Sequence, residues 1–252
     1  MWERYSAVAL DLVRAADEAG VTLRLVGSVA CRLHCEGQHG LLEAMGRENP
    51  PDVDMVTTGS DRARARDLLR SLSYEEDRNM LVAMEGRRYA FREPKLRLHV
   101  DLFVDRLEFC HPIDVTGRFG LDHPTLSLAD LVLSKLQIVQ INQKDLKDLV
   151  ALVLEHDLGP DDREAIDAAY IARLASQDWG LYYTISRNLE RVRQFAAAGP
   201  LTEVDRELIG ARLGALWRQI EGAPKPLKWR LRAKVGPRVR WYEDVEEPEP
   251  AF

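Results

Sequence analysis

The sequence predicts an α/β fold of the α+β kind, in which a mixed β-sheet in the first part of the chain is followed by a helical C-terminal region. Segments in which polar and apolar residues alternate occur before residue 106, and a period of two is typical of strands. A short strand pattern also runs directly into Gly27 and Ser28 and then into helical spacing. From Ser127 onward the apolar residues recur at helical intervals.

The composition is that of an ordinary globular protein. The chain has 252 residues, of which 46% are apolar and 30% charged, enough for one large domain or for a domain of about 150 residues with a smaller companion. The net charge of -6 excludes no class of partner, because a basic patch can be local. Three cysteines are too few to stabilise such a domain by disulfide bonds. We therefore expect a cytoplasmic protein with no leader peptide and no membrane partner.

Helices and strands are expected to alternate in the first part of the chain. Residues 3–19 place apolar side chains on one helical face and end at Gly20, a residue type that often terminates helices. After this helix we expect a strand over 22–26, a helix after Gly27 and Ser28, a loop over 36–51, a strand over 52–56, a helix capped by Ser60, a hairpin over 80–92 that turns near 85–86, and a strand over 97–105.

The remainder of the chain is expected to be helical and then irregular. Helices are predicted over 127–136, 144–156, 161–176, 180–197 and 202–221. We divide the chain into an α/β domain over 1–157, a helical region over 158–222, and a tail over 223–252 that is first basic and then acidic.

Three aspartates on two predicted strands form the candidate site. Asp52 and Asp54 are two residues apart, so both side chains point to the same side of their strand. Asp101 lies on another alternating strand, and the three carboxylates would converge if the two strands are neighbours. Such acids repel one another unless a cation neutralises them. Mg²⁺ prefers carboxylate oxygens and completes its coordination with water and phosphate groups, which predicts a magnesium site that takes a nucleoside triphosphate.

Gly27 and Ser28 provide the phosphate side of this prediction. They lie where a strand passes into a helix, and backbone N–H groups at a helix start bind anions. Lys135 and Lys144, farther along the chain, could offset charge on the phosphates. On amphipathic helices such lysines often serve only in ion pairs with nearby acids such as Asp145 and Asp148. Asp105 lies on the same strand face as Asp101 and is a reserve for the third acid.

The order of these motifs resembles a known family. The segments Leu25-Val26-Gly27-Ser28, Pro51-Asp52-Val53-Asp54 and His99-Val100-Asp101-Leu102 resemble the motif series of the nucleotidyltransferase superfamily related to DNA polymerase beta. Within it the chain is most similar to the bacterial AbiEii toxin-type nucleotidyltransferases, through the stretches 131–139 and 142–149 that carry a helical lysine and aspartate motif. The resemblance covers roughly residues 5–155. The 23 residues between Ser28 and Asp52 exceed the usual spacing, which indicates either an inserted loop that shapes the acceptor site or a chance match at Gly27 and Ser28.

The resemblance implies a Mg²⁺-dependent enzyme that transfers a nucleoside monophosphate from an NTP to an acceptor. Asp52, Asp54 and Asp101 would hold the metal, and Asp101 would also help to deprotonate the acceptor. Gly27 and Ser28 would position the triphosphate. The toxin-type resemblance suggests the 3′ end of a tRNA as acceptor and an antitoxin protein as partner.

Other acceptors and another class of protein remain open on the sequence alone. A small molecule such as an antibiotic hydroxyl, or a protein side chain, would also serve as acceptor, and a non-catalytic protein could keep the fold to bind a nucleotide or a partner chain. The tail residues 225–241 combine basic and aromatic side chains, which is typical of an RNA contact. The same cations could instead pair with the acidic residues that follow.

Overall fold

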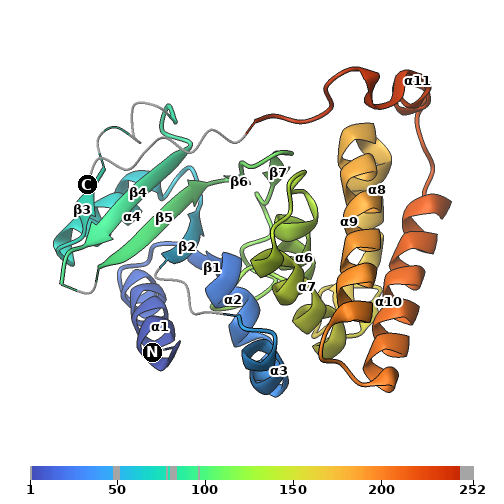
Figure 1. The fold of residues 1–252 in the computed structure, drawn as a ribbon. Helices are drawn as coiled ribbons and strands as arrows, with labels where there is room; N and C mark the ends of the chain where they lie inside the picture. The colour runs from blue at the N-terminus through green and yellow to red at the C-terminus, as the bar shows by residue number, and fades with distance from the viewer. Residues whose placement is uncertain (1, 48–51, 78, 80–83, 96, 245–252) are drawn as a thin grey trace.

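The structure is a computed structural model that describes residues 2–47, 52–77, 79, 84–95 and 97–244. It confirms the predicted fold class: a mixed sheet in the first part of the chain is followed by a helical C-terminal region (Figure 1). Within the described residues no helix is long and apolar enough to cross a membrane.

A five-stranded sheet forms the centre of the N-terminal part, in the order β1-β2-β5-β4-β3. Its strands are β1 (Leu23–Val26), β2 (Asp52–Thr57), β3 (Glu75–Glu76), β4 (Arg88–Glu93) and β5 (Leu98–Val104). Strands β2 and β5 run parallel, whereas β1 with β2, β4 with β5, and β3 with β4 are antiparallel. The predicted strands over 22–26, 52–56 and 97–105 are therefore confirmed, and the strands that carry the aspartates are neighbours.

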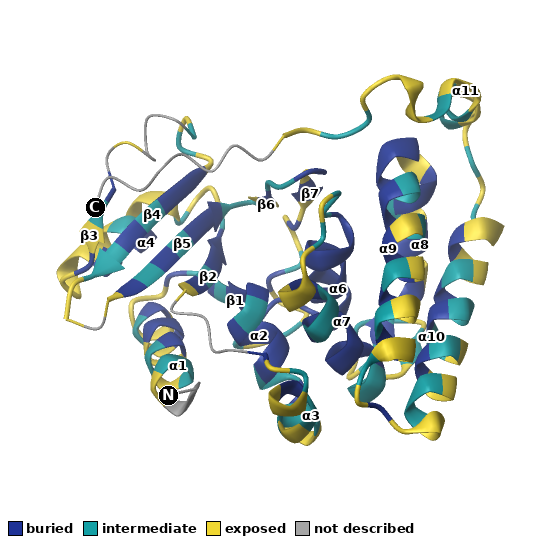
Figure 2. Ribbon diagram, in the orientation of Figure 1, coloured by how far each residue is buried: buried dark blue, intermediate teal, exposed yellow. Residues whose placement is uncertain are grey.

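Alternation along these strands builds the core. Val53 and Met55 of β2 and Leu98, Val100 and Leu102 of β5 are completely buried. Helices α1 (Trp2–Glu18), α2 (Gly27–Leu33) and α4 (Arg62–Ser71) flank the sheet, and α1 contacts β1, α2 and α4. Figure 2 shows the resulting pattern, with buried residues concentrated in the sheet and on the inward helix faces.

Two helices connect the sheet to the C-terminal region. Helix α6 (Leu128–Leu136) is buried along its whole length, and α7 (Gln143–Glu155) packs beside it and against α2. Ser127 and Asn142 cap their first turns by accepting hydrogen bonds from the backbone N–H groups of Asp130 and Asp145. Such caps satisfy donors that the helix itself leaves unpaired. Both helices lie where the sequence predicted them.

The C-terminal region is a group of three helices that packs on α6 and α7. They are α8 (Ala168–Gln177), α9 (Trp179–Ala198) and α10 (Glu203–Gly222). The buried apolar residues form one cluster that runs from α1 through the sheet to α10. The predicted boundary at residue 157 follows the end of α7, and the core continues across it. The division into separate domains stays a prediction.

Several element boundaries differ from the prediction. The loop expected over 36–51 contains a short 3-10 helix (Glu36–Gln38) and α3 (His39–Ala44). Helix α4 begins after Asp61, not after Ser60, whose hydroxyl bonds that of Thr58 at 2.9 Å. Of the hairpin expected over 80–92, residues 80–83 lie outside the described residues, and β4 instead pairs with β3 and β5.

The helix predicted over 161–176 begins later, at Ala168. The residues before it contain two short parallel strands, β8 (Leu158–Gly159) and β9 (Ile166–Asp167). Asp167 then caps the helix by accepting from the N–H of Tyr170 at 2.9 Å. Between β5 and α6 lie two further short strands, β6 (Arg106–Leu107) and β7 (Ile113–Asp114).

The prediction of an irregular tail was wrong for its first part. Helix α11 (Leu227–Val235) forms between prolines, and its Trp229 donates a hydrogen bond from Nε1 to the carbonyl of Ala175 at 3.1 Å. Beyond it, Trp241 donates to Thr184 Oγ1 at 3.1 Å. The chain thus returns from the helices toward the sheet (Figure 1). The aromatic residues of the tail serve as anchors, which is a structural use that the sequence pattern did not indicate.

Candidate nucleotide and metal site

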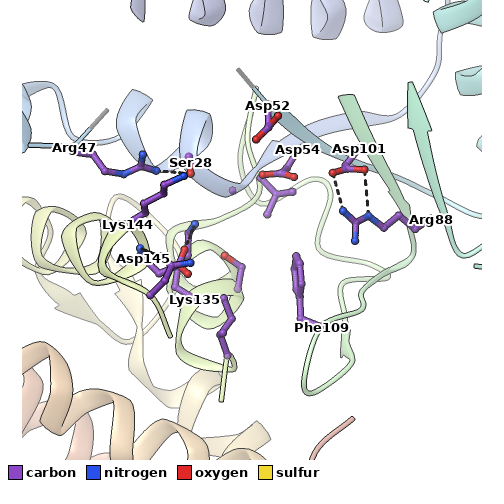
Figure 3. Close-up of a pocket in the computed structure, with 15 residues that line it drawn as sticks. Ser28, Arg47, Asp52, Asp54, Arg88, Asp101, Phe109, Lys135, Lys144 and Asp145 are labelled. Carbon is purple, nitrogen blue, oxygen red and sulfur yellow. Dashed lines mark hydrogen bonds and ion pairs between the residues drawn. The ribbon is translucent and has the colours of Figure 1, made fainter. Parts of the chain in front are cut away.

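The three aspartates predicted for the site lie together at one end of the β2 and β5 pair. Asp54 is directly opposite Asp101 in the parallel register, and Asp52 lies two residues before Asp54 on β2. Figure 3 shows their carboxylates in a row along the cavity. The register brings them together because residues of equal parity on neighbouring strands point to the same side of the sheet.

Gly27 allows this arrangement. It has φ of +70°, and a Cβ at this position would lie 2.0 Å from Asp54 Oδ2. Any side chain larger than hydrogen would therefore displace the Asp54 carboxylate, and it would also be strained by the left-handed backbone conformation. The glycine of the predicted Gly-Ser turn is required here by the close approach of an aspartate.

Asp54 is the member of the row that has no hydrogen bond or ion pair among the described residues. Its environment is unfavourable to a negative charge. Burial, as the largest cause, and the adjacent Asp101, as the next, raise the pKa of Asp54 to about 7. Lys135 and Arg88 act in the opposite direction. A positive ligand close to Asp54 would relieve both effects.

Asp101 is held by an arginine from the neighbouring strand. Arg88 of β4 donates from Nη2 to Asp101 Oδ2 at 2.8 Å and from Nε to Oδ1 at 3.3 Å. Its guanidinium also lies 5.0 Å from the centre of the Phe103 ring. This two-point contact keeps one carboxylate of the row paired with a cation from the protein itself.

A second group of charged residues lies on the other side of the cavity, beneath α2. Lys135 of α6 donates to Asp145 Oδ1 at 2.7 Å and lies 3.4 Å from Asp148 Oδ2. Burial alone would lower the pKa of Lys135, but Asp148 and Asp145 raise it above its ordinary value. The ammonium is therefore committed to two aspartates of α7.

Arg47 links this group to the Gly-Ser turn. It donates to both carboxylate oxygens of Asp148, at 2.8 and 3.0 Å, and from Nη2 to Ser28 Oγ at 2.6 Å. Arg47 follows α3, inside the segment whose length departs from the usual motif spacing. The longer connection thus supplies a buried arginine that fixes the orientation of the Ser28 hydroxyl.

The two groups face each other across a cavity of about 530 Å³. Among the described residues that line it, Lys144 is exposed and is the cation with neither a hydrogen bond nor an ion pair. Phe109 and Ile138 provide apolar surface, and the ring of Phe109 stands in the cavity facing the carboxylates (Figure 3). The cavity therefore combines carboxylates, an available cation and an aromatic ring.

All seven residues predicted for the site line this cavity: Gly27, Ser28, Asp52, Asp54, Asp101, Lys135 and Lys144. Asp105, the reserve for the third acid, does not belong to it. That residue lies four positions farther along, where its Oδ1 accepts a hydrogen bond from the N–H of Gly59 at 2.8 Å. Sequence reasoning missed Arg47, Arg88 and Phe109. The unusual length of the 29–51 segment was a signal for Arg47, whereas no motif marked the other two.

The donor set suits a hard divalent cation, with one qualification. Asp52 and Asp54 offer carboxylate oxygens on the same side of a strand, which is the chemistry that Mg²⁺ prefers. Within the part of the chain that the structure describes, however, no three His, Cys, Asp or Glu side chains are grouped as a metal site, and Asp101 is paired with Arg88. Asp101 would join Asp52 and Asp54 as a ligand only after Arg88 moves.

The chain matches no protein-family model and no curated protein.

Proposed function

We propose that this protein is a Mg²⁺-dependent nucleotidyltransferase that moves a nucleoside monophosphate from an NTP to an acceptor. The observation that carries the proposal is the position of Asp54: it has no hydrogen bond or ion pair among the described residues, lies beside Asp101 on paired strands, and faces a cavity with an available lysine. Carboxylates on one wall and a lysine on the other match a substrate that brings a metal ion together with phosphates.

Each of the cavity residues would have a separate role in such a transfer. Asp52 and Asp54 would hold Mg²⁺, which, when bound, supplies charge neutralisation to the phosphates and to the attacking oxygen. Lys144 would contact the triphosphate from the opposite side, and Gly27 leaves room for Asp54 beside the turn. Asp101, once released from Arg88, would join Asp52 and Asp54 at the metal and accept the proton of the acceptor hydroxyl. That hydroxyl oxygen bonds to the α-phosphorus as the bond to the leaving pyrophosphate breaks.

Lys135 and Ser28 have supporting parts in this proposal. Both are engaged in the network of Arg47, Asp145 and Asp148, so they would hold α2, α6 and α7 in place around the cavity. Contact of Lys135 with phosphate, as the sequence suggested, would require it to leave two aspartates. The acceptor would be an RNA 3′ end, a small-molecule hydroxyl or a protein side chain, and the tail cations would contact an RNA acceptor.

The test is transfer of label from each of the four α-³²P NTPs, with Mg²⁺, to total tRNA, to a panel of aminoglycoside antibiotics and to the protein itself. Asp54→Asn removes the central carboxylate while keeping its shape. Asp105→Asn is the matched control, because Asp105 lies on the same chain segment but outside the cavity, and Asn is among the residues that tolerate its positive φ.

Label on one acceptor that is lost in Asp54→Asn and kept in Asp105→Asn would support the proposal and identify the acceptor class. Equal transfer by the two variants would place the activity elsewhere. If no acceptor is labelled, binding of NTP measured by calorimetry separates a nucleotide-binding protein from one with no nucleotide site, and either result contradicts the transferase.

A further inference from the structure

The ion pair between Arg88 and Asp101 has the features of a fixed contact. The side chain of Arg88 is 9% exposed and that of Asp101 20% exposed. Their strands are antiparallel neighbours in which Ala90, not Arg88, is opposite Asp101, so the arginine reaches across diagonally. A planar guanidinium that donates twice to one carboxylate is more directional than an ammonium contact.

This contact occupies the carboxylate that the proposed function needs as a third metal ligand. Asp54, directly beside it, has no such cation among the described residues. A metal ion that enters from water and approaches Asp54 therefore meets a guanidinium close by that repels it. Arg88 also lines the cavity, and its fork of donors fits a phosphate as well as it fits a carboxylate.

We propose that Arg88 is a positioning residue that holds Asp101 away from the metal until the phosphates of the nucleotide draw the guanidinium off. The inference rests on the proposed function and deepens it: metal and nucleotide would bind cooperatively, because each step removes an obstacle to the other. The nucleotide offers Arg88 a new anion, and Asp101 is then free to complete the metal site. The metal alone would bind weakly.

The first arm of the test uses Mn²⁺ alone, without nucleotide, and measures free Mn²⁺ by electron paramagnetic resonance during titration. Arg88→Gln should lower the dissociation constant roughly tenfold, within the range typical of coupled sites. Arg88→Lys should lower it less, because an ammonium keeps the charge but not the two-point contact. Arg87→Gln is the matched control: it carries the same charge change one residue away, where Arg87 pairs with Glu108, and it should leave the constant unchanged.

The second arm uses inorganic tripolyphosphate in EDTA and measures its binding by calorimetry. Arg88→Gln should weaken this binding roughly tenfold, whereas Arg87→Gln should not. Melting temperatures with and without Mn²⁺ control for folding. If Arg88→Gln is destabilised without metal, Mn²⁺ should raise its melting temperature by more than it raises that of the unchanged protein.

The outcomes separate this inference from the proposed function. Equal Mn²⁺ affinity in Arg88→Gln and the unchanged protein, with binding lost in Asp54→Asn, overturns the role of Arg88 and leaves the metal site intact. Mn²⁺ binding that survives Asp54→Asn, or that is absent from every variant, overturns the proposed function and the inference with it. Unchanged tripolyphosphate binding in Arg88→Gln overturns the proposal that Arg88 leaves Asp101 to bind phosphate.

Discussion

Two acidic groups meet at the cavity, and they are built in opposite ways. Asp145 and Asp148 on α7 are buried and held by Lys135 and Arg47, with four short contacts among these residues. Asp54 on β2 faces the same cavity without a hydrogen bond or ion pair among the described residues. Burial of an acid therefore does not by itself identify its role. Paired acids fix helices in place, whereas an acid left without a cation is the one that can attract a charged ligand.

The largest loss of stability should come from removing the cation that pairs with Asp145 and Asp148. Lys135→Met removes the cation between two buried aspartates, and loss of one partner from a buried ion pair typically destabilises a protein by about 3–5 kcal/mol. The free energy of unfolding from urea titration measures it. Lys144→Met is the matched control, because Lys144 is exposed and makes no ion pair with the residues that the structure describes, and it should change stability by less than about 0.5 kcal/mol. Similar losses in both variants would show that the two lysines do not differ as the structure indicates.

A smaller loss of stability should follow when the close approach between Gly27 and Asp54 is disturbed. Gly27→Ala adds a Cβ 2.0 Å from Asp54 Oδ2 at a φ of +70°. We expect the free energy of unfolding to fall by about 2 kcal/mol and Mn²⁺ binding to be lost. Gly210→Ala is the control, because a Cβ there meets nothing within 4 Å and a helical alanine is slightly stabilising. Unchanged Mn²⁺ binding in Gly27→Ala would contradict the role given to Asp54.

That the three aspartates share one face of the sheet could be predicted from the sequence. Asp52, Asp54 and Asp101 stand on the polar side of strands of period two, so two such strands that bury their apolar sides together present these residues on one face. That the two strands are neighbours was a condition of the prediction, and the structure fulfils it. The helices α6 and α7 were also predictable, since Ser127 and Asn142 precede long apolar repeats and cap them. These inferences depend on local pattern alone.

The contacts of the site depend on geometry that local pattern does not contain. Arg88 reaches Asp101 because of the register of β4 on β5, and a shift of one residue would have turned it to the other face. Arg47 reaches Asp148 across 101 positions of the chain. Lys135 was predicted to offset phosphate charge, but nothing in the spacing showed that two aspartates of α7 would take its ammonium instead.

A final change in stability should have opposite signs for the two acidic groups. Asp54→Asn removes a charge that no described residue pairs with, so in EDTA at pH 8 it should stabilise the protein by on the order of 1 kcal/mol, after allowance for screening by water at the cavity. The pKa of Asp54 is raised to about 7 in the folded protein, above its unfolded value. Its unfavourable contribution therefore grows as the pH rises from about 4 to 7 and vanishes below that window.

Unfolding free energies of the unchanged protein and Asp54→Asn, measured from pH 5 to pH 8, should accordingly diverge toward high pH. Asp148→Asn is the comparison from the paired group: it leaves Arg47 buried without its carboxylate and should destabilise the protein throughout this range. If both substitutions destabilise to a similar extent, Asp54 has a partner that neutralises it, and the difference between the two acidic groups on which the metal site depends does not hold.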